Sequence, residues 1–283
     1  MGQARMTVAD FVSAASARKL TMLTAYDYPT ARFLDEAGLD GILVGDSLGD
    51  VVLGYPNTLP VTMADMLHHV KAVARGVQKT FLIADMPFLS YQVTPEEALR
   101  NAGRFVQEAG AQAVKLEGGK PFTATIRKIV ESGIPVMAHL GLTPQSVHRF
   151  GGYRVQAREE AAARRLLEDA RVVEEAGAFA LVLECIPASL AELVTEILTI
   201  PTIGIGAGSG CSGQILVLHD LLGMSPERAP KFVKRYRKLG EEISQAAGEF
   251  IAEVRDGKYP GREHSFSMSD EVVSRLREEV GKA

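Results

Sequence analysis

Acidic and basic side chains follow short apolar segments at several places along this chain of 283 residues. Asp46, Asp85 and Glu117 each end such a segment, and His139 and Glu184 end two later ones. Short apolar runs are typical of strands that are covered on both faces of a parallel sheet. Because an unpaired charge at the end of a buried strand is costly, we expect these strand ends to meet and form a functional site.

Three of these acids, Asp46, Asp85 and Glu117, fall on the second, third and fourth predicted strands. Neighbouring strands lie about 4.8 Å apart, so the carboxylates would crowd, repel one another and have raised pKa values. A divalent cation removes the repulsion, and oxygen ligands without His or Cys at metal-binding spacing favour Mg²⁺ over Zn²⁺. We therefore predict Mg²⁺ here, with Glu117 as a ligand or just behind the ligands. Mn²⁺ and Co²⁺ stay open, and each acid taken alone fits a strand-end cap or a salt bridge better.

The remaining polar strand ends suggest acid–base chemistry. Lys115 shares a strand face with Glu117 and either neutralises that acid or binds a substrate carboxylate or a developing enolate oxygen, two compatible roles. Glu184 has apolar neighbours in the sequence and is a candidate general base. His139 is either a second polar residue of the pocket or a satisfied core histidine. We expect His139 and Glu184 to lie on the side opposite the predicted metal.

Strand and helix patterns alternate along the whole chain. The expected strands cover 19–27, 41–47, 81–86, 113–117, 135–139, 180–185, 202–206 and 215–219. The expected helices cover 29–38, 62–77, 94–108, 121–132, 157–176, 188–198 and about 229–256. This order predicts an α/β fold of the (β/α)8 type, a TIM barrel, with its active site at the carboxyl ends of the strands. We expect a single domain over 1–283.

Several segments depart from a regular barrel. A capping box formed by Thr7 and Asp10 predicts a short N-terminal helix that ends near Ala17. Only residues 207–214 separate the seventh and eighth strands, too few for a helical crossover, so this connection should be irregular. From about 257 we expect an extended tail that ends in a charged helix over 269–281. The glycine-hinged loop 148–154 fits an active-site lid or an ordinary surface loop equally well.

Composition excludes several classes of protein. The net charge of −4 and the pI near 5.9 give no sign of a nucleic-acid partner, and no apolar run reaches the 18 residues that a membrane span needs. Cys185 and Cys211 stand far apart and are expected to be reduced thiols in a cytoplasmic protein. Glycines 208, 210 and 213 match G-x-G-x-x-G, but a strand follows where a helix is needed, so a dinucleotide site is not expected.

The ordered motifs of this chain strongly resemble those of ketopantoate hydroxymethyltransferase. The resemblance extends from about residue 6 to about residue 266 without a break. The motifs are VGDSLG at 44–49, TLPVT at 58–62, ADMPF at 84–88, VKLEG at 114–118, AHLGLTPQ at 138–145, GGY at 151–153, LE at 183–184, GIGAG at 204–208 and VLHD at 217–220.

The resemblance implies a barrel enzyme of pantothenate synthesis that moves a hydroxymethyl group from 5,10-methylenetetrahydrofolate to 3-methyl-2-oxobutanoate, giving 2-dehydropantoate. It places Mg²⁺ on Asp46 and Asp85 with Glu117 nearby, substrate contacts on Ser47 and Lys115, and the proton acceptor on Glu184. It also puts His139 in the substrate pocket. It further implies a large homo-oligomer, typically a decamer.

Two other readings of the same residues stay open. A Mg²⁺-dependent carbon–carbon lyase or mutase of the pyruvate-enolate type would use a similar barrel and metal. Such enzymes need a reactive nucleophile or acid after the fourth or fifth strand, and no cysteine lies near residues 118–120. A non-catalytic barrel is the second alternative, and the full set of charged strand ends argues against it.

Overall fold

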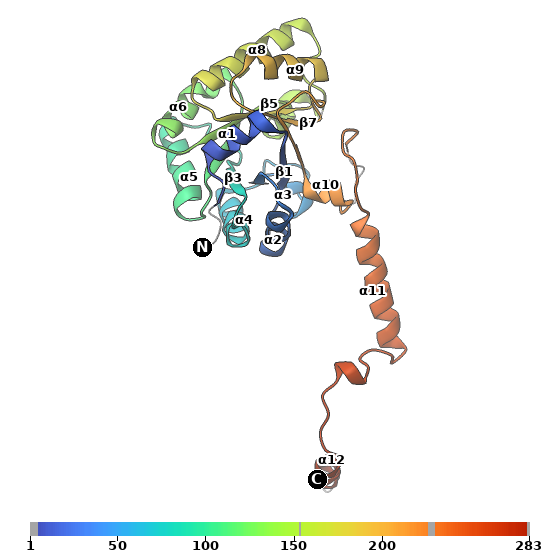
Figure 1. Cartoon of the computed structure of the whole chain (residues 1–283). Coiled ribbons are helices and arrows are strands. Elements are labelled where there is room, and N and C mark those ends of the chain that lie inside the picture. The colour runs from blue at the N-terminus through green and yellow to red at the C-terminus, as the bar shows by residue number, and fades with distance from the viewer. Residues whose placement is uncertain (1–4, 153, 226–229, 282–283) are drawn as a thin grey trace.

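The computed structural model describes residues 5–152, 154–225 and 230–281. Eight parallel strands close into a barrel in sequence order, and helices surround it (Figure 1). The strands are β1 Leu20–Thr24, β2 Gly41–Val44, β3 Phe81–Asp85, β4 Ala113–Glu117, β5 Val136–Gly141, β6 Ala180–Glu184, β7 Thr202–Ile205 and β8 Gly213–Leu216. The predicted TIM-barrel fold is confirmed.

Helices follow most of the strands, as the sequence predicts. Those of the outer layer are α2 Tyr28–Ala37, α4 Met63–Gly76, α5 Pro95–Gln107, α6 Thr123–Glu131, α8 Glu160–Glu175 and α9 Ala188–Ile197. Shorter helices lie in the loops at α3 Leu48–Val51, α7 Val147–Phe150 and α10 Leu218–Leu222. Within the described residues, none of the helices combines the length and the apolar character needed to cross a membrane.

Alternation along the strands divides the apolar side chains between two cores. One set, which includes Phe81, Ile83 and Met137, fills the barrel interior, and the other packs between the strands and the helices. The N-terminal helix α1 Val8–Ala17 begins with the predicted capping box, and its Phe11 packs against Phe81 with ring centroids 5.5 Å apart. This aromatic contact closes the amino end of the barrel and leaves the carboxyl end for the site.

The connection between β7 and β8 contains no helix, as expected, but the eighth strand begins two residues earlier than predicted and ends at Leu216. Gly213 pairs with Leu20 of β1 and with Ile203 of β7, and a Cβ atom at Gly213 would meet Leu20 Cβ at 2.7 Å. Because glycine has no Cβ atom, Gly213 can pair with both neighbouring strands at the start of β8. As a result His219, which we expected at a strand end, lies in α10.

The long helix after β8 differs most from the prediction. Helix α11 covers Leu239–Arg255, so it begins about ten residues later than expected, and residues 226–229 of the predicted range lie outside the described residues. Neither α11 nor α12, Asp270–Val280, has a buried residue. Figure 1 shows both helices leading away from the barrel. We call residues 239–281 the arm.

Candidate active site

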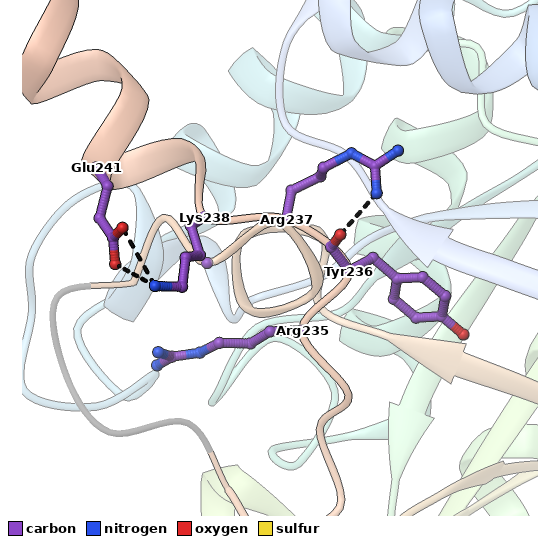
Figure 2. A pocket seen from close by; sticks show the side chains of 6 residues that line it. Arg235, Tyr236, Arg237, Lys238 and Glu241 are labelled. Carbon is purple, nitrogen blue, oxygen red and sulfur yellow. Dashed lines mark hydrogen bonds and ion pairs between the residues drawn. The ribbon is translucent and has the colours of Figure 1, made fainter.

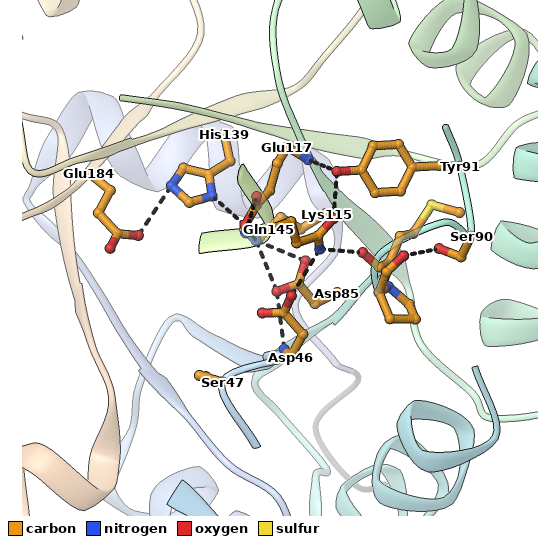
Figure 3. Close-up of polar contacts among 12 residues, drawn as sticks. Asp46, Ser47, Asp85, Ser90, Tyr91, Lys115, Glu117, His139, Gln145 and Glu184 are labelled. Carbon is orange, nitrogen blue, oxygen red and sulfur yellow. Dashed lines mark hydrogen bonds and ion pairs between the residues drawn. The ribbon is translucent and has the colours of Figure 1, made fainter. Parts of the chain in front are cut away.

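The strand ends bring all the predicted site residues to one mouth of the barrel (Figure 3). Asp85 ends β3, Lys115 and Glu117 lie on β4, and His139 and Glu184 lie on β5 and β6. Register explains the convergence, because Asp85 pairs with Lys115 and Glu117 pairs with His139. These side chains therefore stand one layer above the apolar interior of the barrel.

Asp46 and Asp85 are direct neighbours. The backbone N–H of Asp46 donates to Oδ2 of Asp85 at 3.3 Å, and both side chains are buried. Lys115 Nζ donates to the two carboxylate oxygens of Asp85 at 2.8 and 2.9 Å and lies 3.6 Å from Oε1 of Glu117. The predicted neutralising role of Lys115 is thus present in the geometry, alongside any contact with substrate.

Mutual repulsion perturbs the acids as the sequence predicts for two of them. Burial and the neighbouring Asp85 carboxylate raise the pKa of Asp46 well above its ordinary value. Burial also raises the pKa of Asp85, although Lys115 partly opposes this. For Glu117 the order reverses: burial favours the neutral acid, but Lys115 and His139 outweigh it and lower the pKa. One lysine therefore does not balance the negative charge of this quadrant.

His139 connects the acidic quadrant to the candidate base. Its Nδ1 lies 3.5 Å from Oε1 of Glu117, and its Nε2 lies 3.2 Å from Oε2 of Glu184. Burial and Lys115 disfavour the imidazolium, but the contacts with Glu117 and Glu184 outweigh them and raise the pKa of His139. His139 therefore contacts Glu117 of the three acids, and its expected place opposite the metal stays a prediction. Glu184 is the more open end, since 16% of its side chain is exposed.

Backbone shape holds Glu184 at the mouth. Its carbonyl accepts a hydrogen bond from Leu142 N–H at 2.9 Å, and Gly141 has a φ of 96° where any Cβ atom would collide with that carbonyl. Cys185, the next residue, has a φ of 48°, which is rare for a residue other than glycine. The β5 and β6 ends are thus fixed to each other directly behind the candidate base.

Two uncharged residues belong to the cluster and were not predicted as site residues. Gln145 donates from Nε2 to Oδ2 of Asp46 at 2.9 Å, and its backbone N–H donates to Oε2 of Glu117 at 3.1 Å. The Tyr91 hydroxyl donates to Oε1 of Gln145 at 2.8 Å. The only signal in the sequence is the position of Gln145 at the end of the 138–145 motif.

Ser47 and the loop after β5 complete the predicted set. The Ser47 hydroxyl lies 2.9 Å from the Tyr26 hydroxyl, next to Asp46. In the loop, α7 ends at Phe150 and is capped by Gly151. Tyr153 lies outside the described residues, so the choice between a lid and a surface loop stays a prediction. Within the described residues, no group of three His, Cys, Asp or Glu side chains is arranged to hold a metal ion by itself.

A separate pocket of about 310 Å³ lies where the chain enters the arm (Figure 2). It is lined by Gly223, Arg235, Tyr236, Arg237, Lys238 and Glu241. None of the candidate site residues lines it. The cluster at the barrel mouth therefore remains the candidate active site.

A closed parallel barrel with buried, mutually perturbing charges at the carboxyl ends of its strands defines the class of (β/α)8-barrel enzymes. Comparison with known sequences gives the family. The chain belongs to the ketopantoate hydroxymethyltransferase family, whose model matches residues 5–262. It is therefore an enzyme, a transferase.

Curated relatives agree over nearly the whole chain. A 3-methyl-2-oxobutanoate hydroxymethyltransferase from Syntrophus aciditrophicus (strain SB) is 59% identical over 248 residues, covering 88% of this chain and 91% of the relative. One from Syntrophotalea carbinolica (strain DSM 2380 / NBRC 103641 / GraBd1) is 58% identical over 266 residues, covering 94% of this chain and all of the relative (100%).

Solved structures share the fold at low sequence identity. Phosphonopyruvate hydrolase matches with a TM-score of 0.61 at 17% identity, covering 98% of this chain and 97% of the other. A 2,3-dimethylmalate lyase of the PEP mutase/isocitrate lyase superfamily matches with a TM-score of 0.57 at 16% identity, covering 97% and 96%. At these identities the likeness concerns the barrel alone.

Proposed function

We propose that this enzyme transfers a hydroxymethyl group from 5,10-methylenetetrahydrofolate to 3-methyl-2-oxobutanoate and so forms 2-dehydropantoate for pantothenate synthesis. The names of the curated relatives support the oxoacid and the transferred group. The observation that carries the proposal is the continuous set of contacts from the Asp46–Asp85 pair through Lys115, Glu117 and His139 to Glu184. These contacts join the acids and lysine that would bind a cation and an anionic substrate to the candidate base, Glu184.

The acidic quadrant suits a divalent cation. Asp46, Asp85 and Glu117 are buried around one lysine, and burial together with repulsion among the acids raises the pKa of Asp46 and Asp85 in spite of Lys115. We propose that Asp46 and Asp85 hold Mg²⁺, with Glu117 behind them and with substrate and water as the other ligands. Bound Mg²⁺ would act as a Lewis acid that stabilises negative charge on the keto oxygen. Mn²⁺ and Co²⁺ are alternatives that the oxygen donors do not discriminate against strongly.

The protein side chains bind the substrate and move its proton. Lys115 attracts the anionic 2-oxo acid, Ser47 contacts it, and His139 contributes a polar wall to the same pocket. Glu184 removes the proton from C3 and holds it as a carboxylic acid beside Nε2 of His139, 3.2 Å away. The C3 carbanion, delocalised as the enolate, attacks the methylene carbon of the folate and forms the new carbon–carbon bond. Both carbon–nitrogen bonds of that methylene group break, one water supplies the hydroxyl group, and tetrahydrofolate leaves with the two protons on its nitrogens.

A Mg²⁺-dependent lyase or mutase acting on a pyruvate-type enolate is the second candidate, because the structural neighbours include a lyase of that kind. It differs from the transferase in needing no folate. A folate-dependent product therefore separates the two.

We also propose that the enzyme assembles with further copies of itself. No helix separates β7 from β8, and the five-residue α10 is the only helix between β8 and the arm in the described part of the chain. On the outer surface of the barrel, Phe33 of α2 is exposed, and so are Thr21 and Gln214 of the strands β1 and β8. Helix α11, which comes next in sequence, buries nothing of its own. We propose that the apolar face of α11 from a second copy covers this part of the barrel surface, around Phe33, Thr21 and Gln214. The decamer and the cytoplasmic location stay predictions.

The direct test is product formation. Purified protein with Mg²⁺, 3-methyl-2-oxobutanoate and 5,10-methylenetetrahydrofolate should form 2-dehydropantoate, detected by mass spectrometry, and omission of the folate should abolish it. Cleavage of a branched or phosphonate-bearing 2-oxo acid without folate, and no 2-dehydropantoate with it, would favour the lyase or mutase and contradict the proposal.

A further inference from the structure

The side-chain amide of Gln145 is fully engaged by protein groups. Its Nε2 donates to Oδ2 of Asp46 and to the carbonyl of Met86, both at 2.9 Å. Its Oε1 accepts from the Tyr91 hydroxyl at 2.8 Å and from Gln92 Nε2 at 3.1 Å. A glutamine amide has two N–H donors and two acceptor lone pairs, so every position is used. The residue is buried, and a satisfied buried amide is held in one orientation.

Tyr91 determines which way the amide faces. The hydroxyl of Tyr91 accepts a hydrogen bond from the backbone N–H of Glu117 at 3.2 Å. Its own proton is therefore directed to Gln145, where it requires the carbonyl oxygen rather than the NH₂ group. Consequently the NH₂ group must face Asp46. Glu117, Tyr91, Gln145 and Asp46 thus form one directional chain of hydrogen bonds across the mouth.

The same residue reaches the two outer acids of the cluster. Its side chain engages Oδ2 of Asp46, and its backbone N–H engages Oε2 of Glu117. In both cases one carboxylate oxygen is occupied, and the other, Oδ1 or Oε1, lies outside the contacts of Gln145. Within the described residues, Oε1 of Glu117 accepts no hydrogen bond, but it faces Lys115 Nζ at 3.6 Å and His139 Nδ1 at 3.5 Å. A carboxylate held by one oxygen in this way keeps its other oxygen in a fixed position.

We propose that Gln145 is a positioning residue, oriented by Tyr91, which fixes the carboxylate of Asp46 so that its Oδ1 is presented to the bound cation and holds the carboxylate of Glu117 in place behind the metal ligands. The inference rests on the proposed function, because it concerns the same site, and it adds a residue whose role is indirect. Groups that orient ligands from behind commonly contribute about 10- to 100-fold to metal affinity.

Mn²⁺ binding to the substrate-free protein tests the inference, with the electron paramagnetic resonance signal of free Mn²⁺ as the readout. Gln145→Met keeps the length of the side chain but cannot donate to Asp46, and we expect it to weaken Mn²⁺ binding by about 10- to 100-fold. Tyr91→Phe keeps the buried ring and removes the hydroxyl that orients the amide, so it should weaken binding in the same direction by a smaller factor. Tyr91→Phe also decides the question if Gln145→Met does not fold.

Gln112→Met is the matched control. Gln112 also uses both ends of its amide, donating to the carbonyl of Met6 at 2.9 Å and accepting from Leu82 N–H at 3.2 Å, but it lies outside the mouth. It should lower thermal stability and leave Mn²⁺ affinity unchanged. If the folded Gln145→Met and Tyr91→Phe proteins bind Mn²⁺ with wild-type affinity, the role of Gln145 is overturned and the proposed function is not. An equal loss of Mn²⁺ affinity in Gln112→Met would have the same consequence. Failure of the wild type to bind Mn²⁺ would instead overturn the proposed metal site, and the inference with it.

Discussion

At the scale of single residues, the mouth of the barrel holds more buried negative charge than positive charge. Three buried carboxylates surround one ammonium group, and burial alone favours their neutral forms. Lys115 is the counterion: burial opposes its charge, but Asp85 and Glu117 outweigh this and raise its pKa. The excess negative charge left on the Asp46 side is what a cation would neutralise.

Removal of one acid should therefore change the metal requirement. Asp85→Asn leaves a side chain of the same shape but without charge, next to Asp46 and Lys115. We expect the Mg²⁺ concentration for half-maximal activity to rise by at least about tenfold, because a charged oxygen ligand is lost. Asp65→Asn, at an exposed cap of α4, is the control. An unaltered Mg²⁺ requirement in Asp85→Asn would remove Asp85 from the ligand set.

Sequence patterns predicted the charged members of this cluster and missed the uncharged ones. Asp85, Lys115 and Glu184 stand at the ends of apolar segments, and the geometry of a parallel barrel alone brings such ends together. Gln145 lies in a short 3-10 turn and Tyr91 in a loop, where no periodicity reveals which way a side chain faces. Their contacts depend on tertiary structure, which is why the network had to be read from the fold.

At the scale of elements, buried acids also join helices to strands far from the mouth. Asp40 precedes β2 and accepts hydrogen bonds from Arg18 at the end of α1 and from the N–H and hydroxyl of Thr21 on β1. Burial opposes its ionisation, but Arg18 and Thr21 outweigh this and lower the pKa of Asp40. One carboxylate thus ties three elements at the amino end of the barrel.

Replacement of Asp40 should cost stability in a pH-dependent way. Asp40→Asn should lower the free energy of unfolding at neutral pH by about 1–3 kcal/mol, because the amide accepts through one oxygen only and carries no charge to pair with Arg18. Since the pKa of Asp40 is lowered in the folded state, its contribution is present above the ordinary aspartate value, about 3.9, and is lost as the pH falls through the folded value. Urea unfolding of both proteins should show the difference shrink in acid. A difference that stays constant through this range would contradict the assignment.

The elements that sequence analysis misplaced lie after β7. Gly213 reads as part of a glycine loop, yet its lack of a side chain is what lets the strand start between Leu20 and Ile203. The helical pattern of α11 predicts a helix that covers the barrel, because amphipathic spacing indicates an apolar face without naming its partner. The other predicted elements end within a few residues of the observed ones, and capping residues such as Thr62 and Thr94 mark several of their starts.

At the scale of the whole molecule, the arm is the unusual feature. Ile243, Phe250, Ile251 and Val254 of α11 recur at helical spacing, and all four are between 45% and 54% exposed. A helix with this apolar stripe is stable when the stripe is covered. On the barrel, Phe33 of α2, Thr21 of β1 and Gln214 of β8 are exposed. The proposed assembly would cover the apolar stripe of α11.

Charge placed on the apolar face of α11 should therefore disrupt assembly. The double variant Ile243→Glu, Phe250→Glu should shift the mass measured by analytical ultracentrifugation towards a monomer, because buried carboxylates without partners are costly. Ala252→Glu, on the opposite side of α11 by helical spacing, is the control and should keep the wild-type mass. A wild-type mass in the double variant, or a monomeric wild type, would contradict this use of the arm.

The most direct test of the account is exchange of the C3 proton of 3-methyl-2-oxobutanoate with solvent deuterium, followed by proton NMR in D₂O with Mg²⁺ and without folate. The wild type should exchange this proton. Glu184→Gln should bind Mn²⁺ with unchanged affinity and lose exchange by about 10²- to 10⁴-fold, the contribution of a positioned base. Exchange at the wild-type rate in Glu184→Gln, or none in the wild type, would contradict the mechanism.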